Sequence, residues 1–232
     1  MMHGAVGDTE SNVRYAVYWA PDPQHPLAPI AHQWLFQPEP EVPIREPAQY
    51  GFHATLKPPF RLAAGQTEFD LLGSVQALAI RHQAFELPRL QVAWLNGFLA
   101  LRPIQPLDRA HPLWSLADAC VTELDEFRRP PNELELARRR ALGLDHEQEA
   151  LLLRWGYPHL LQRWRFHMTL TDKIPARQQQ EQALQDRLRR LFEPALTLPL
   201  HCAAICIFRQ AAPGQNFEAY RRLSLGDPRD PQ

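Results

Sequence analysis

Two stretches decide how this sequence is interpreted, and they are His53-Ala54-Thr55-Leu56 and His167-Met168-Thr169-Leu170. Both follow the pattern His-x-Thr-Leu, and both lie in apolar runs that are typical of β-strands. Alternate residues of a strand point to the same face. Each His is therefore expected beside its own Thr, with the Leu on the opposite, core-facing side. Chance would produce two copies in roughly one of a thousand chains of this composition, so the duplication is informative.

The two stretches occupy matching places in a weak internal repeat. Each half of the chain is predicted to run strand, helix, His-bearing strand, helix, strand. A Leu-Pro pair follows each His at a similar interval, and these pairs are Leu87-Pro88 and Leu198-Pro199. The stretch that precedes His167 is the longer one, by about the length of residues 130–160. We therefore interpret that segment, which is patterned as two helices, as an insertion into the second repeat.

The repeat predicts an α+β fold with two pseudo-symmetric lobes. Each lobe is expected to hold an antiparallel sheet flanked by helices, and both His-Thr pairs should line a cleft between the lobes. The predicted boundaries are residues 13–225 for the whole domain, 13–95 for lobe 1, 98–225 for lobe 2 and 130–160 for the insertion, with flexible tails at 1–12 and 226–232.

Local signals predict where several elements begin and end. Asn96-Gly97 is typical of a tight hairpin turn between two strands. Thr67 and Asn132 should cap the N-termini of helices, and Pro58-Pro59 should close the first His-bearing strand. Helices are expected over residues 26–35, 67–82, 112–127, 132–140, 145–155 and 176–192, and strands over 15–19, 50–56, 85–95, 98–102, 165–171, 203–209 and 217–225.

Composition limits the classes of protein to which the chain can belong. Its 232 residues carry 25 Lys+Arg against 26 Asp+Glu, with 45% hydrophobic residues, as in ordinary globular domains. A net charge of -1 argues against a surface that grips extended nucleic acid. Three cysteines without a C-x-x-C pair indicate neither a disulfide framework nor a metal site. No signal peptide or membrane span is apparent, so we expect a cytoplasmic protein.

Two imidazoles that face one another can perform general acid–base catalysis. A neutral His accepts a proton from attacking water, and a protonated His donates one to the leaving oxygen. The hydroxyls of Thr55 and Thr169 can donate hydrogen bonds to phosphate oxygens as charge builds there. Lys57 lies two residues beyond Thr55 and should share its face if the strand continues. These groups suit hydrolysis of a phosphodiester without a metal or another cofactor.

Four further side chains are candidates for substrate binding. Tyr50 could stack on a base or ribose, or merely cover a sheet edge. Tyr157 could close over the site from the insertion. Arg138 or Arg139 could reach a phosphate, but consecutive helical residues point about 100° apart, so the Arg138-Arg139-Arg140 run cannot all face one site. The alternative is a solvated helix whose arginines pair with Glu133 and Glu135.

The sequence resembles the 2H phosphoesterase superfamily, whose members carry paired His-x-Thr/Ser motifs in a two-lobed repeat. It is similar, more narrowly, to a bacterial family of proteins of unknown function (DUF1045-like) that is associated with phosphonate-utilisation genes. The segments that carry this narrower similarity are residues 50–60, 135–140, 155–158 and 166–171. The resemblance implies the two-lobed α+β fold and functional roles for His53, Thr55, His167 and Thr169. It does not supply a substrate.

These observations predict a metal-independent phosphodiesterase that hydrolyses a small cyclic phosphodiester, either a 2′,3′-cyclic nucleotide or a cyclic sugar phosphate. By similarity to the superfamily, a 2′,3′-cyclic substrate would open to a 2′-phosphate. The alternative is a non-catalytic module that binds a nucleotide or an RNA end in the same place. The chain has neither a P-loop motif nor a Rossmann fingerprint. Which His is the acid, and the oligomeric state, stay open.

Overall fold

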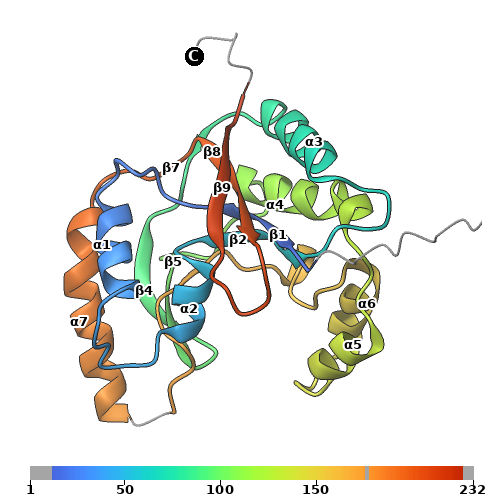
Figure 1. The fold of residues 1–232 in the computed structure, drawn as a ribbon. Coiled ribbons are helices and arrows are strands. Elements are labelled where there is room, and N and C mark those ends of the chain that lie inside the picture. Colours follow the sequence, from blue (N-terminus) through green and yellow to red (C-terminus); the bar gives the residue numbers. More distant parts are fainter. Residues whose placement is uncertain (1–11, 176–177, 227–232) are drawn as a thin grey trace, which may run out of the picture.

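A seven-stranded antiparallel sheet forms the centre of the computed structural model, which describes residues 12–175 and 178–226 (Figure 1). The strand order is β4-β5-β6-β2-β1-β8-β9, and β3 and β7 form a separate pair. The strands are β1 (Arg14–Trp19), β2 (Ala54–Phe60), β3 (Phe85–Glu86), β4 (Leu90–Leu95), β5 (Phe98–Pro103), β6 (Met168–Thr169), β7 (His201–Cys202), β8 (Ala204–Gln210) and β9 (Glu218–Ser224). The prediction of an α+β fold built on antiparallel pairing is confirmed.

The strand order has an internal two-fold symmetry that follows the predicted repeat. When β1 to β4 are matched in sequence order with β5 to β8, the order β4-β5-β6-β2-β1-β8 maps onto itself in reverse. The symmetry axis passes between β2 and β6, where Ala54 pairs with Met168. The strands β4 and β8 lie on the opposite side of the axis from the other strands of their own halves, because β4 pairs with β5 and β8 pairs with β1. Each side of the sheet therefore mixes strands from residues 13–95 and 98–225.

Four helices cover one face of the sheet and bury the main hydrophobic core. The helices of the structure are α1 (Leu27–Leu35), α2 (Arg45–Tyr50), α3 (Glu68–Ile80), α4 (Pro112–Thr122), α5 (Glu133–Arg140), α6 (His146–Trp155) and α7 (Gln178–Leu196). Residues of α1, α3, α4 and α7 join this core together with Val17, Leu56 and Leu170 of the sheet side. The opposite face carries a smaller apolar cluster that includes Tyr18 and Phe208. The site described below lies on this second face.

Local signals set several boundaries as predicted. Asn96 and Gly97 have φ angles of 49° and 91°, as a tight turn between β4 and β5 requires. The Thr67 hydroxyl accepts a hydrogen bond from the Asp70 N–H at the start of α3. Asn132 forms a capping box at the start of α5.

Other boundaries differ from the prediction. Strand β2 continues through Pro58-Pro59 to Phe60. The short β6 pairs only with the beginning of β2, so the two prolines have no neighbouring strand on the β6 side that would need the backbone N–H groups they lack. The helix predicted over 112–127 ends at Thr122 and is followed by a 3₁₀ turn, Asp125–Phe127. Helix α2 was not predicted, and α3 ends at Ile80.

The C-terminal helix reaches further than its predicted end at Phe192. Helix α7 continues to Leu196, and both Phe192 and Ala195 are buried in the main core. Its predicted start at Ala176 lies outside the described residues, and so do the predicted tails at 1–12 and 226–232 except for their inner residues, Asn12 and Gly226. Among the described residues, no helix is both long enough and apolar enough to cross a membrane.

The insertion is a separate pair of helices, α5 and α6, at the margin of the fold (Figure 1). The contacts that connect it to the rest of the protein include two made by arginines outside it. The Arg61 guanidinium pairs with Glu135 at 2.7 Å, and Arg128 donates a hydrogen bond to the Arg154 carbonyl at 3.1 Å. The segment re-enters the fold through a 3₁₀ turn, Leu161–Arg163, and ends at β6. The chain that follows α6 therefore leads directly to the second His-bearing strand.

Candidate active site

The pairing of β2 with β6 brings both His-Thr motifs to one patch of the sheet. Ala54 pairs with Met168, and both side chains are fully buried on the core face. In this antiparallel register His53 lies across from Thr169, and Thr55 lies across from His167. All four side chains are half-buried and point to the opposite face of the sheet from the core. The four side chains singled out by the sequence therefore form one group around the symmetry axis.

The two imidazoles are held in the same way. His53 Nδ1 is 2.9 Å from the Gly51 carbonyl oxygen, and His167 Nδ1 is 2.8 Å from the Arg165 carbonyl oxygen. A carbonyl can only accept, so Nδ1 carries the proton in both rings and Nε2 has the free lone pair. His53 Nε2 lies 3.2 Å from the Thr55 hydroxyl oxygen. Both rings thus present the nitrogen that can accept or donate a proton.

Glycine at position 51 is required by the backbone that holds His53. Gly51 has a φ of 74°, which L side chains rarely adopt. A Cβ atom there would also lie 3.3 Å from the Phe208 ring. This residue supplies the carbonyl that orients His53, so its conformation and the orientation of the imidazole are linked.

The surroundings of the two histidines differ. The Tyr18 ring stacks on His53 with a centroid distance of 3.6 Å and an interplanar angle of 17°. Burial lowers the pKa of His53 to about 4. The centroid of the Phe98 ring lies 5.8 Å from that of the His167 ring. Continuing the β5–β6 register by one residue places Arg102 across from His167. Burial, and then the charge of Arg102, lower the pKa of His167. Both rings are therefore neutral bases in the free protein near neutral pH.

The low pKa of His53 predicts a specific loss of stability in acid. Between about pH 6.5 and 4 the unfolded chain binds a proton at this imidazole and the folded chain does not, so stability falls as pH falls. Going from pH 7 to pH 4.5 should cost about 2 kcal/mol through His53. Denaturant unfolding of the wild type and of His53→Gln at both pH values measures this contribution. The variant should lose about 2 kcal/mol less, and equal losses would contradict a depressed pKa.

Tyr50 lies beside His53, and two other predicted binding residues, Arg139 and Tyr157, approach from the insertion. The Tyr50 ring lies 6.5 Å from the His53 ring and stacks on Phe217 at 5.1 Å. The Arg139 guanidinium lies 4.7 Å from the centre of the Tyr157 ring. Burial raises the pKa of Tyr157, and Tyr50 and Arg139 are among the groups whose charge acts on it. Tyr50, Arg139 and Tyr157 thus belong to one region, which joins the insertion to the histidines.

The arginine run of α5 divides as helix geometry requires. Arg139 contacts Tyr157, Arg138 is exposed, and Arg140 pairs with Glu149 of α6 at 2.7 Å. Glu135 pairs with Arg61 outside the run rather than with a neighbouring arginine. The expected pairing of the run with Glu135 is therefore wrong, whereas the expectation that the three arginines diverge holds.

Lys57 does not lie on the face that carries Thr55. Two residues of β2, Leu56 and Lys57, occupy the space opposite Val17, because the register with β1 shifts at this point. The bulge turns Lys57 to the core side, where it is 2% exposed. Its Nζ donates to the Val121 carbonyl at 3.0 Å and lies 3.9 Å from an Asp125 oxygen. The prediction that Lys57 adds charge at the site is wrong.

Sequence reasoning missed Tyr18, Phe98 and Arg102, which surround the two imidazoles. Tyr18 could have been placed by the alternation of the first strand, since it lies opposite Thr55 in the β1–β2 pair. Phe98 and Arg102 depend on the pairing of β5 with β6, which no local signal in the sequence specifies.

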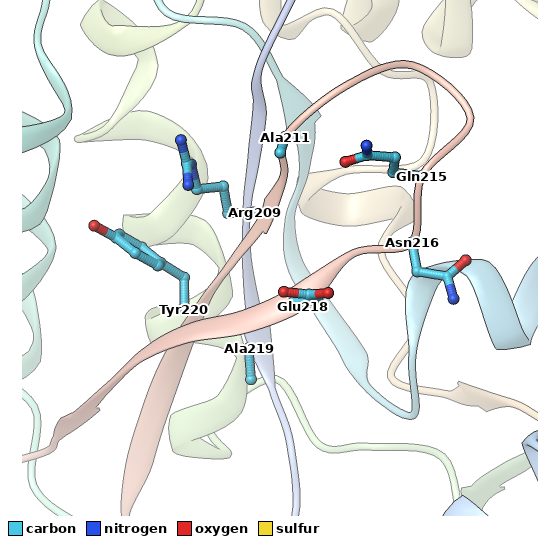
Figure 2. Close-up of a pocket in the computed structure, with 7 residues that line it drawn as sticks. All are labelled: Arg209, Ala211, Gln215, Asn216, Glu218, Ala219 and Tyr220. Carbon is cyan, nitrogen blue, oxygen red and sulfur yellow. The ribbon is translucent and has the colours of Figure 1, made fainter.

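A shallow cavity of about 140 Å³ lies away from these residues, on the β8–β9 hairpin (Figure 2). Figure 2 shows Arg209 and Tyr220 at one end of it and Gln215 and Asn216 at the other. Neither histidine lines this cavity. Among the residues that the structure describes, no group of three or more His, Cys, Asp or Glu is arranged to hold a metal ion.

The chain matches the model of a family described as protein of unknown function (DUF1045), over residues 55–218, and it belongs to that family. Two curated relatives are both named ribose 1,5-bisphosphate phosphokinase PhnN. The protein of Janthinobacterium sp. (strain Marseille) is 37% identical over 93% of this chain and 51% of its own length. The protein of Laribacter hongkongensis (strain HLHK9) is 34% identical over 70% of this chain and 40% of its own length. The chain thus spans about half the length of these relatives or less.

Among solved structures, the chain is similar to a crystal structure of a phosphoesterase, with a TM-score of 0.45 and 13% identity, covering 92% of this chain and 99% of the other. It is also similar to Escherichia coli LigT in the apo form, with a TM-score of 0.44 and 14% identity, covering 94% and 99% of the two chains.

Proposed function

We propose that this protein is a metal-independent phosphodiesterase of the 2H type that hydrolyses a small cyclic phosphodiester. The observation that carries the proposal is the group of four side chains, His53, Thr55, His167 and Thr169, on one face across the β2–β6 pair. Two imidazoles with matched Nδ1 hydrogen bonds and unprotonated Nε2 atoms supply an acid and a base. The two hydroxyls supply donors for phosphate oxygens.

The proposed reaction is a single displacement at phosphorus. One imidazole takes a proton from water as the water oxygen bonds to phosphorus, and the bond from phosphorus to one ring oxygen breaks. The other imidazole gives its proton to that leaving oxygen, which becomes a hydroxyl, and the product is a phosphomonoester. We assign the base to His53, because its stacking on Tyr18 and its low pKa keep it neutral at working pH. His167 then acts as the acid, and it gains its proton when the anionic substrate binds.

Two substrate classes fit this reaction, and the names of the relatives favour one of them. Ring opening of a phosphoribosyl cyclic phosphate yields a ribose bisphosphate, which is the class of compound in the name of the curated relatives. This chain has no P-loop, so we do not ascribe the phosphokinase activity to it. We therefore place a cyclic sugar phosphate before a 2′,3′-cyclic nucleotide as the substrate, in keeping with a link to phosphonate metabolism.

A substrate screen at neutral pH tests the proposal. It offers 2′,3′-cyclic nucleotides, cyclic ribose phosphates and 2′-5′ linked dinucleotides, with and without EDTA. We expect turnover of a cyclic phosphate that EDTA does not reduce. Turnover that requires an added metal would contradict the mechanism. Tight binding without turnover would instead support a non-catalytic module that holds nucleotides or RNA ends in the same place.

A further inference from the structure

Three arginines near His167 have no carboxylate partner. Arg102, Arg139 and Arg165 take part in none of the ion pairs between described residues. Arg102 gives one N–H to the Trp94 carbonyl, which leaves the rest of its guanidinium donors available. Unpaired cations that converge on one place indicate an anionic ligand.

The register and the backbone contacts place two of these arginines next to His167. Arg102 is its cross-strand neighbour when the pairing of Leu101 with Met168 is continued by one residue. Arg165 supplies the carbonyl that accepts the His167 Nδ1–H. The positive charges of both lower the pKa of His167, as expected if both guanidinium groups lie near the ring.

The third arginine approaches from the insertion. Arg139 lies over the Tyr157 ring, and the Tyr157 ring meets the His159 ring edge-on at 5.7 Å. Burial, and then the charges of Arg165, Arg163 and Arg139, lower the pKa of His159, and the charge of His159 in turn acts on His167. Asp145, which also acts on His159, is already paired with Arg163 at 2.7 Å. The carboxylate that acts on His159 is thus paired with an arginine outside the three.

The His53 side of the symmetry axis has no such charge in the equivalent place. Continuing the β1–β2 register puts Ala20 across from His53, where Arg102 stands across from His167. The equivalent of Ala100 is Tyr18, which stacks on His53. One side of the site is therefore aromatic and the other is cationic, although the backbone around them is symmetric.

We propose that Arg102, Arg139 and Arg165 form a second anion subsite, and that the substrate is a cyclic phosphodiester bearing a separate phosphomonoester group that binds there. The scissile phosphate needs only the group of four side chains at the axis, so three additional cations on one side match a second phosphate with two negative charges. This inference rests on the proposed function, because it assumes that the cyclic phosphate lies between the histidines.

A matched pair of substrates tests the subsite. The pair is ribose 1,2-cyclic phosphate with and without a 5-phosphate, and the measured quantity is the ratio of their kcat/KM values. We expect the wild type to prefer the 5-phosphorylated compound by 10-fold or more. Arg139→Gln and Arg165→Gln should each reduce that preference by about 3- to 10-fold. Arg189→Gln on α7, whose arginine is 46% exposed, is the control and should keep the preference.

A binding measurement separates failure of the subsite from failure of the proposed function. Calorimetric titration with ribose 5-phosphate needs no turnover, and its affinity should fall in both arginine variants but not in Arg189→Gln. If neither cyclic compound and no 2′,3′-cyclic nucleotide is hydrolysed, the proposed function fails while this titration still decides the subsite. Equal kcat/KM values for the two compounds in the wild type, or arginine variants that bind ribose 5-phosphate normally, would overturn the subsite. Arg102→Lys, which keeps the charge, should retain more of the preference than Arg102→Gln.

Discussion

Replacing either His53 or His167 with alanine is expected to lower kcat on the hydrolysed cyclic phosphate by about 10³-fold or more. Each imidazole handles one proton of the displacement, and loss of either leaves water or the leaving oxygen without its partner. The half-buried rings lie on the face away from the main core, so both variants should fold. Steady-state kinetics measures the loss, and circular dichroism with denaturant unfolding checks the fold.

His32→Ala is the matched control for these variants. His32 is exposed on α1, on the far side of the sheet from the group of four, and its loss should leave kcat unchanged. Thr55→Ala and Thr169→Ala should cost less than the His variants, about 10- to 100-fold, because each removes one hydrogen-bond donor to the phosphate. Full activity in either His variant would rule out paired acid–base catalysis on this face.

The alternation of the His-bearing strands was predictable because strand geometry alone dictates it. His53 and Thr55 face one way, and Ala54 and Leu56 face the other, as the period of two requires. The matching positions of the two motifs also anticipated the two-fold symmetry. Pairing partners were not predictable in the same way, because register depends on contacts between distant strands. The interleaving of β4 with β5 and of β8 with β1 is a property of the whole sheet.

The misplacement of Lys57 and the omission of Arg102 both arise because pairing between strands, and not only spacing along one strand, decides which residues share a face. A bulge in β2 reverses the facing of the residues that follow it until the register shifts again, and nothing in the local sequence indicates the extra residue opposite Val17. Lys57 therefore enters the core, although its spacing from Thr55 places it at the site. Arg102 reaches the site only through the pairing of β5 with β6, which is non-local. Spacing along one strand predicts a face only as far as the strand stays regular.

Replacing Asp125 with alanine is expected to lower the free energy of unfolding by about 3 kcal/mol. The carboxylate lies 3.9 Å from the Lys57 ammonium nitrogen and 2.7 Å from Arg128 Nε, and it is only 15% exposed. Burial lowers the pKa of Lys57 to about 8, and the Asp125 charge acts in the opposite direction, so the carboxylate helps to keep the buried ammonium protonated. Without it, two largely buried cations face each other with no compensating charge.

Lys57→Met provides the comparison that identifies the cause of this destabilisation. Methionine removes the buried charge and fills similar space, and Asp125 keeps its contacts with Arg128 and Arg154. The change should therefore alter the free energy of unfolding by about 1 kcal/mol or less, which reflects the lost hydrogen bond to the Val121 carbonyl. Denaturant unfolding at pH 7 measures both variants.

A double variant, Lys57→Met with Asp125→Ala, should be more stable than Asp125→Ala alone, because only one cation is then left unpaired. If the double variant is the less stable of the two, the loss in Asp125→Ala comes from packing rather than from uncompensated charge.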